Sequence, residues 1–233
     1  MVALIGLCVV ATAFFIALRI TKGGVYGLLS KTLASLCFVV LGIYGAYRSG
    51  FSLSVAFVLI GLILGMIGDI VLDLKVMYKQ DKDAYLNAGM LSFGVGHISY
   101  FIALTLLCTR VIFKASTVFN GVLLIALGIA GILTILIVTI ASPMLKLNFG
   151  KFKIQTYLYT FVLTFMTAYA LTVSIWWKPA LIYGIGLGLI FLSDLILSNQ
   201  YFGKYENNKL FTILNHAIYY AGQIVIATFL FFI

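Results

Sequence analysis

Residues 51–73 read FSLSVAFVLIGLILGMIGDIVLD, and this stretch decides the fold class. Its first 22 residues contain one charged side chain, Asp69, and Asp73 follows at once. A helix needs about 20 mostly apolar residues to cross the hydrocarbon core of a bilayer. The stretch therefore predicts a membrane-spanning helix that carries two carboxyl groups near its end.

Composition extends this conclusion to the whole chain. Of the 233 residues, 64% are hydrophobic and 9% are charged, whereas soluble domains carry about 25% charged residues. An ordinary soluble protein is therefore excluded. Seven more stretches have spanning length, namely 2–18, 25–45, 84–108, 115–141, 154–177, 179–199 and 210–232. We predict an all-α integral membrane bundle of eight transmembrane helices that forms a single domain over residues 1–233.

The net charge of +9 indicates a membrane orientation rather than nucleic-acid binding. The 15 Lys and Arg residues are scattered between apolar stretches without a basic face, so we expect membrane lipids and no nucleic acid as partners. Loops on one predicted side hold Arg19, Lys22, Lys75, Lys79, Lys82, Lys146, Lys151, Lys153, Lys204 and Lys209. Loops on the side of both termini hold Arg48, Arg110, Lys114 and Lys178. Because cytoplasmic loops are enriched in Lys and Arg, we expect both termini outside, in a bacterial cell membrane.

The two halves of the chain resemble each other. The corresponding positions are Asp69 and Asp194, His97-x-x-Tyr100 and His216-x-x-Tyr219, and Lys31-Thr32 and Gln155-Thr156. They occur in the same order and in corresponding predicted helices. The pattern predicts two parallel four-helix repeats, 1–112 and 113–233, related by an axis along the membrane normal.

Ionisable residues within these helices gather towards the lysine-rich side. They are Lys31, Asp69, Asp73, His97, Asp194 and His216. Asp69 and Asp73 share a helix face, and His216, Tyr220 and Gln223 form a polar stripe at i, i+4 and i+7. Since such groups are costly in hydrocarbon unless they face a cavity or one another, we expect a polar cavity open to the cytoplasm.

Less specific interpretations exist for some of these residues. Asp73 could be a solvated cap beside Lys75, and the histidines could be hydrogen-bonded packing residues. Asp81, Asp83 and Glu206 lie beside lysines in predicted loops, which is typical of solvated charges.

Paired carboxyl groups favour general acid–base hydrolysis. If Asp69 and Asp194 meet, one can hold a proton while the other stays ionised. The chain has no Gly-x-Ser-x-Gly, catalytic Cys-His or His-Glu-x-x-His pattern, so we expect neither a covalent nucleophile nor a metal or other cofactor. A metal site built from His97, His216 and an aspartate is a weaker alternative, because two histidines on different helices give no ligand spacing.

A proton-coupled transporter of a small molecule or lipid is the competing class. Carriers also place Asp, His and Lys inside repeated helical bundles. However, carriers are typically built with broken helices, and the two prolines, Pro143 and Pro179, fall at predicted helix ends. Polar groups confined to one leaflet also argue against a path through the membrane.

The ordered motifs resemble a known family. They are Gly68-Asp69, then Gly89, Phe93, His97 and Tyr100, then Ser193-Asp194, and finally Tyr220-x-x-Gln223. Together they resemble the signature of the YhhN-type lysoplasmalogenases over essentially the whole chain. Lys31 matches the lysine of the family, although Thr32 stands where proline usually follows.

The resemblance implies an ether hydrolase that cleaves the vinyl-ether bond of a lysophospholipid. Asp69 and Asp194 would be the catalytic pair, and His97 would orient them together with Tyr100. Lys31 would hold the phosphate, and Tyr219 or Tyr220 would face the headgroup amine. The remaining substrate-binding candidates are Asp73, His216 and Gln223.

Overall fold

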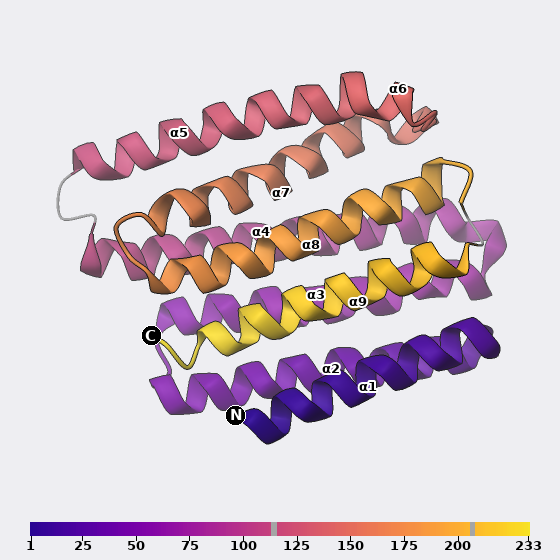
Figure 1. The fold of residues 1–233 in the computed structure, drawn as a ribbon, viewed down its shortest axis with the longest axis horizontal. Helices are drawn as coiled ribbons and strands as arrows, with labels where there is room; N and C mark the ends of the chain where they lie inside the picture. The colour runs from indigo at the N-terminus through magenta and orange to yellow at the C-terminus, as the bar shows by residue number, and fades with distance from the viewer. Residues whose placement is uncertain (113–115, 206–207) are drawn as a thin grey trace. The chain divides into compact units, whose positions relative to one another are not determined.

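The computed structural model describes residues 1–112, 116–205 and 208–233 and is all-helical over them, with no strand. Eight helices in this part of the chain are long and apolar enough to cross a membrane, which confirms the predicted fold class. They are α1 (Val2–Thr21), α2 (Gly24–Ser49), α3 (Leu53–Met77), α4 (Lys82–Val111), α5 (Ser116–Ile135), α7 (Lys153–Val173), α8 (Pro179–Phe202) and α9 (Lys209–Phe229) (Figure 1). Short segments between them are η1 (Lys79–Asp81), η2 (Leu136–Ala141), α6 (Ser142–Met144) and η3 (Gly150–Phe152).

The chain forms two compact units. Unit 1 comprises Met1–Ala103 and Gln223–Ile233, and unit 2 comprises Leu104–Gly222. The boundaries between the units therefore fall within two helices, after Ala103 in α4 and after Gly222 in α9. Two of the residues considered above, Lys114 and Glu206, lie outside the described residues.

Unit 1 packs through glycines on α2 and α3. A Cβ at Gly68 would lie 2.7 Å from the Phe93 ring of α4, and one at Gly61 would overlap the Tyr100 ring. On α2, a Cβ at Gly45 would lie 2.8 Å from Leu230, in the chain segment that follows α9. Small residues let helices approach closely in a membrane, where packing replaces the hydrophobic effect as the force that joins helices. Helix α3 therefore lies in contact with both α2 and α4.

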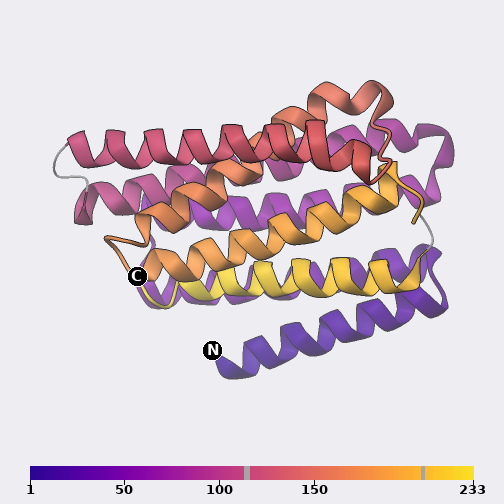
Figure 2. The same cartoon turned by 45° about the horizontal axis from the view of Figure 1, so that its top comes forward.

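Unit 2 joins α5, α7 and α8 side by side (Figure 2). Thr134 of α5 and Thr164 of α7 share a hydrogen bond of 3.2 Å between their hydroxyl groups. Helix α9 reaches α8 at Gly222, whose Cβ would lie 2.8 Å from the carbonyl oxygen of Gly186. As in unit 1, a glycine sets the closest approach between two helices.

The predicted helix over 115–141 contains a feature that its apolar sequence does not reveal. Its last turn, η2, is a π-helix, in which the backbone N–H of Ser142 donates to Ile137 five residues back. Pro143 follows, and proline has no N–H with which to continue an α-helical ladder. The wide turn therefore lies directly before a proline, and the helical segment continues through Pro143 to Met144 in α6.

Gly61→Ala tests the packing of α3 against α4. The added methyl group overlaps the buried Tyr100 ring, so we expect a loss of roughly 1–3 kcal/mol in unfolding free energy, measured by thermal or denaturant unfolding in detergent. Gly94→Ala is the matched control because no atom lies within 4 Å of its Cβ position. Equal stability of both variants would contradict the close α3–α4 contact.

Candidate active site

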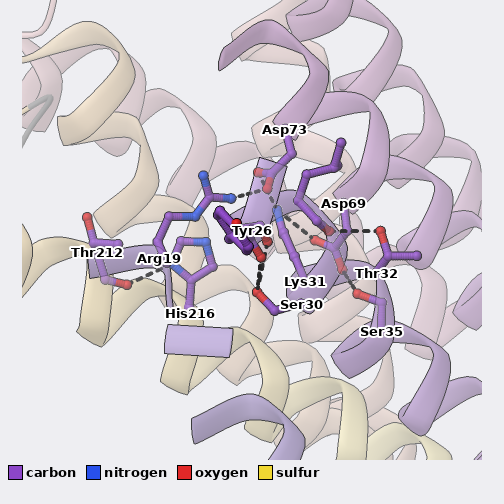
Figure 3. Close-up of polar contacts among 12 residues, drawn as sticks. Arg19, Tyr26, Ser30, Lys31, Thr32, Ser35, Asp69, Asp73, Thr212 and His216 are labelled. Atoms are coloured by element: carbon purple, nitrogen blue, oxygen red, sulfur yellow. Dashed lines mark hydrogen bonds and ion pairs between the residues drawn. The ribbon is translucent and has the colours of Figure 1, made fainter. Parts of the chain in front are cut away.

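Asp69 lies on the inner face of α3, where donors from α2 bind both of its oxygens. The residue is 2% exposed. The Ser35 hydroxyl donates to Oδ2 over 2.7 Å, and the Lys31 ammonium lies 3.2 Å from Oδ1 (Figure 3). A buried carboxylate is tolerated only when it is paired and hydrogen-bonded, and these two contacts meet that requirement.

Asp73 lies one turn further along α3 and is buried as well. Lys31 Nζ lies 3.3 Å from its Oδ1, and the Arg19 guanidinium of α1 forms an ion pair with its Oδ2. The interpretation of Asp73 as a solvated cap beside Lys75 is therefore wrong. Helix α3 continues to Met77, and α1 supplies a cation that keeps Asp73 inside the unit.

Lys31 joins the two carboxylates. It is 5% exposed, and its ammonium reaches both Asp69 and Asp73. Arg19, Lys31, Asp69 and Asp73 form what we call the four-charge cluster, in which two cations face two anions. Removing one member would leave an uncompensated buried charge, which is strongly destabilising.

Arg19 is the member of the four-charge cluster that the sequence did not reveal. The sequence predicts a loop position because Arg19 follows an apolar stretch, but Arg19 lies in the last turn of α1. Its guanidinium lies over the Phe15 ring at 5.5 Å and against Gly27, where a Cβ would lie 3.2 Å from Cζ. The signal available was its depth, which matches that of Lys31 and Asp73.

His97 is buried on α4 with one ring nitrogen free. Its Nδ1 lies 2.8 Å from the carbonyl oxygen of Phe93. A carbonyl oxygen only accepts, so Nδ1 carries the proton. Nε2 is buried and has no hydrogen-bond partner. The role of His97 in orienting the carboxyl groups stays a prediction.

Tyr100 and Gln223 form a second polar contact in unit 1. The Tyr100 hydroxyl donates to Oε1 of Gln223 over 3.3 Å, and both side chains are buried. The Tyr100 ring stands edge-on to His97 at 5.8 Å between centroids. These contacts link α4 to the last turns of α9.

Unit 2 holds Asp194 in a comparable way. The Tyr159 hydroxyl of α7 donates to Oδ2 over 2.6 Å, and the Ser193 hydroxyl lies 3.4 Å from Oδ1. Asn215 of α9 donates to the Ser193 carbonyl oxygen over 2.8 Å, which fixes the backbone beside Asp194. Sequence reasoning did not find Tyr159, although it lies four residues after Gln155, as Ser35 does after Lys31.

The aspartates of the two units have similar hydrogen-bond contacts. In each, a hydroxyl on one helix donates to the aspartate of the next, from Ser35 in unit 1 and from Tyr159 in unit 2. His216 also repeats the arrangement of His97, because its Nδ1 lies 2.7 Å from the carbonyl oxygen of Thr212 (Figure 3). The predicted repeat, with its boundaries, stays a prediction.

The other predicted residues have packing contacts. Tyr219 and Tyr220 are buried, and their rings meet edge to face at 5.2 Å between centroids. Their role towards a headgroup amine stays a prediction. Within the described ranges, no group of three or more His, Cys, Asp and Glu side chains is placed to hold a metal ion.

Eight apolar helices define a multi-pass membrane protein, and Asp69 and Asp194 place carboxyl groups among its helices, one buried and one half-buried. The model of the YhhN family matches residues 26–230, nearly the whole chain. The chain therefore belongs to the YhhN family, which is the lysoplasmalogenase family. Neither the curated proteins nor the solved structures compared with this chain match it.

A double-mutant cycle tests the ion pair between Arg19 and Asp73. We expect Arg19→Gln and Asp73→Asn each to lower the unfolding free energy, and the double variant to lose less than their sum. Each single change strands a charge that the double change removes, so the coupling free energy should be about 1–3 kcal/mol. Lys22→Gln, an exposed neighbour, is the control. Additive losses in denaturant unfolding would contradict the pair.

Proposed function

We propose that this protein hydrolyses the vinyl-ether bond of lysoplasmalogens, releasing a fatty aldehyde and glycerophosphocholine or glycerophosphoethanolamine. Membership of the YhhN family supports a hydrolase of this type. The observation that carries the proposal is the buried Asp69 carboxyl, held between the Ser35 hydroxyl and the Lys31 ammonium. A fixed carboxyl group in an apolar bundle suits acid–base chemistry on an uncharged lipid bond.

The reaction needs a proton and a water molecule. A proton adds to the vinyl carbon distant from the ether oxygen and leaves an oxocarbenium ion. Water then adds to the carbon beside the oxygen and gives up one proton. The resulting hemiacetal collapses to the aldehyde and the glycerol hydroxyl, so one water is consumed and no proton is lost overall.

Asp69 is suited to the ionised role. Its two oxygens face a hydroxyl donor and an ammonium, so the carboxylate is positioned to stabilise the cation and accept a proton from water. Asp194 contacts hydroxyl groups, which can accept as well as donate, and this suits a group that delivers a proton. The pairing of the two aspartates stays a prediction, related to the paired carboxyl groups of glycosidases.

Asp69→Asn and Asp194→Asn test these roles. We expect each to lower the rate of aldehyde release from defined vinyl-ether lysolipids at least about a hundredfold, the scale of a lost acid or base. Asp81→Asn, an exposed carboxylate outside the bundle, is the matched control and should keep full activity.

Each variant needs a thermal melt close to that of the parent protein. A folded and active Asp69→Asn or Asp194→Asn protein would contradict the mechanism. Loss of activity on adding a chelator would favour metal chemistry instead. Absence of aldehyde release by the parent protein, together with uptake of lysolipid into vesicles, would favour the transporter.

The orientation belongs to the same proposal. We place the ends of α1 and α3 that hold the four-charge cluster at the cytoplasmic surface and both termini outside, because the lysine-rich loops follow those ends. The site would then take its substrate from the cytoplasmic leaflet.

A cavity in unit 2 offers room for the hydrocarbon chain. It has a volume of about 310 Å³ between α5, α7 and α8, and its lining includes Ala168, Thr164 and Phe191. The Thr164 hydroxyl donates to carbonyl oxygens of its own helix, so the lining presents mainly apolar groups. Phe191 lies three residues before Asp194 on α8, one turn along the same face.

Ala168→Phe tests this role of the cavity. The larger side chain fills part of the space, so we expect the KM for a long-chain lysolipid to rise about tenfold while that for a short-chain one changes little. Steady-state aldehyde release from a series of chain lengths measures the difference. Leu181→Phe, an exposed position on α8, is the control. An unchanged chain-length profile would exclude the cavity from substrate binding.

A further inference from the structure

We infer that Arg19 of α1 binds the phosphate of the lysolipid headgroup. This inference rests on the proposed function and assigns the charge recognition that the resemblance had implied for Lys31. The ligand chemistry is a phosphodiester monoanion next to a single hydrocarbon chain.

Lys31 is not free to bind a phosphate in this structure. Its ammonium is shared between Asp69 and Asp73 at 3.2 and 3.3 Å, and its side chain is 6% exposed. A phosphate that displaced either carboxylate would leave a buried charge without its partner. Lys31 is therefore a positioning residue for the two carboxyl groups.

Arg19 has donors that Asp73 does not use. Its Nη2 pairs with Asp73, whereas its Nε is buried without a hydrogen-bond partner. An unsatisfied donor on a charged group is costly, and an anion that reached it would remove the cost. Guanidinium groups bind phosphate through two parallel N–H donors, which a lysine cannot supply.

The position of Arg19 suits a headgroup. Its side chain is 14% exposed in the last turn of α1, just before Lys22 and the turn at Gly23. Phe15 below the guanidinium and Gly27 beside it hold the plane in place. Lysolipid phosphates lie at the ends of spanning helices, as Arg19 does. Asp69 lies one turn before Asp73 on α3, nearer to the middle of the membrane, where the ether bond of the same lipid would lie.

Charge balance permits an anion at this point. The four-charge cluster is neutral, so Asp73 does not by itself repel a phosphate from Arg19. Lys22, three residues after Arg19, adds a positive charge at the same end of α1. Arg19 also precedes residue 26, where the match to the family model begins. This anchor therefore comes from a helix that the family model does not cover.

Equilibrium binding of uncleavable lipids tests the inference independently of catalysis. The probes are hexadecyl-glycerophosphocholine, which has an alkyl ether and a phosphate, and hexadecylglycerol, which lacks the phosphate. Their displacement of a fluorescent lysolipid is measured with the full-length protein in nanodiscs. The variants are Arg19→Gln/Asp73→Asn, Asp73→Asn alone and the control Lys22→Gln.

We expect the double variant to bind the phosphate-bearing lipid about tenfold more weakly and hexadecylglycerol unchanged. Asp73→Asn alone should keep or tighten binding, because it releases Arg19 from its carboxylate partner. Lys22→Gln should change little. If the double variant does not fold, Arg19→Lys is used instead because it preserves the charge. This variant should bind the phosphate-bearing lipid more weakly and hexadecylglycerol unchanged.

Three results would overturn the inference. The first is that the double variant binds both lipids more weakly by the same factor, and the second is that it binds neither more weakly. The third is that inorganic phosphate displaces the fluorescent lysolipid as strongly as hexadecyl-glycerophosphocholine does. The last would assign the site to free phosphate. Because neither lipid is cleaved, loss of the proposed hydrolase activity would leave this test intact.

Discussion

The ammonium of Lys31, held between Asp69 and Asp73, is the interaction on which unit 1 depends. Three helices place their polar side chains to satisfy it: α2 supplies Lys31 and Ser35, α3 both carboxylates, and α1 the guanidinium of Arg19. In a bundle with few charges, this arrangement fixes which faces of these helices turn inward. The same contacts keep the Asp69 carboxyl group ordered within an apolar surrounding.

In both units a hydroxyl group donates to an aspartate, but the other contacts described at the two aspartates differ. In each, a hydroxyl four residues after the aligned lysine or glutamine donates to the aspartate of the next helix. Unit 1 adds cations to that contact, whereas the Asp194 contacts described in unit 2 come from the hydroxyls of Tyr159 and Ser193. If Asp69 and Asp194 form the proposed pair, acid–base catalysis requires the two members to differ in protonation.

Much of this could be predicted from the sequence. The eight helices follow from the length of the apolar stretches, and Lys31, Asp69 and Asp73 from their common depth. Arg19 was missed because a basic residue that ends an apolar stretch usually belongs to a loop. Ser35 and Tyr159 were missed because hydroxyl groups inside helices often bond to their own backbone, as Thr156 does with Phe152. Only tertiary packing decides which hydroxyl turns towards another helix.

The last turns of α9 have a consequence for how the protein is made. Gln223 bonds to Tyr100, and the segment around Leu230 packs on Gly45, so residues 223–233 complete unit 1 although they are far along the chain from its other helices. During synthesis, α1, α2 and α3 therefore enter the membrane before the segment 223–233 that completes their packing. Gly42 and Gly45 of α2 gain their contacts with Ala227 and Leu230 only when α9 and the residues after it are inserted.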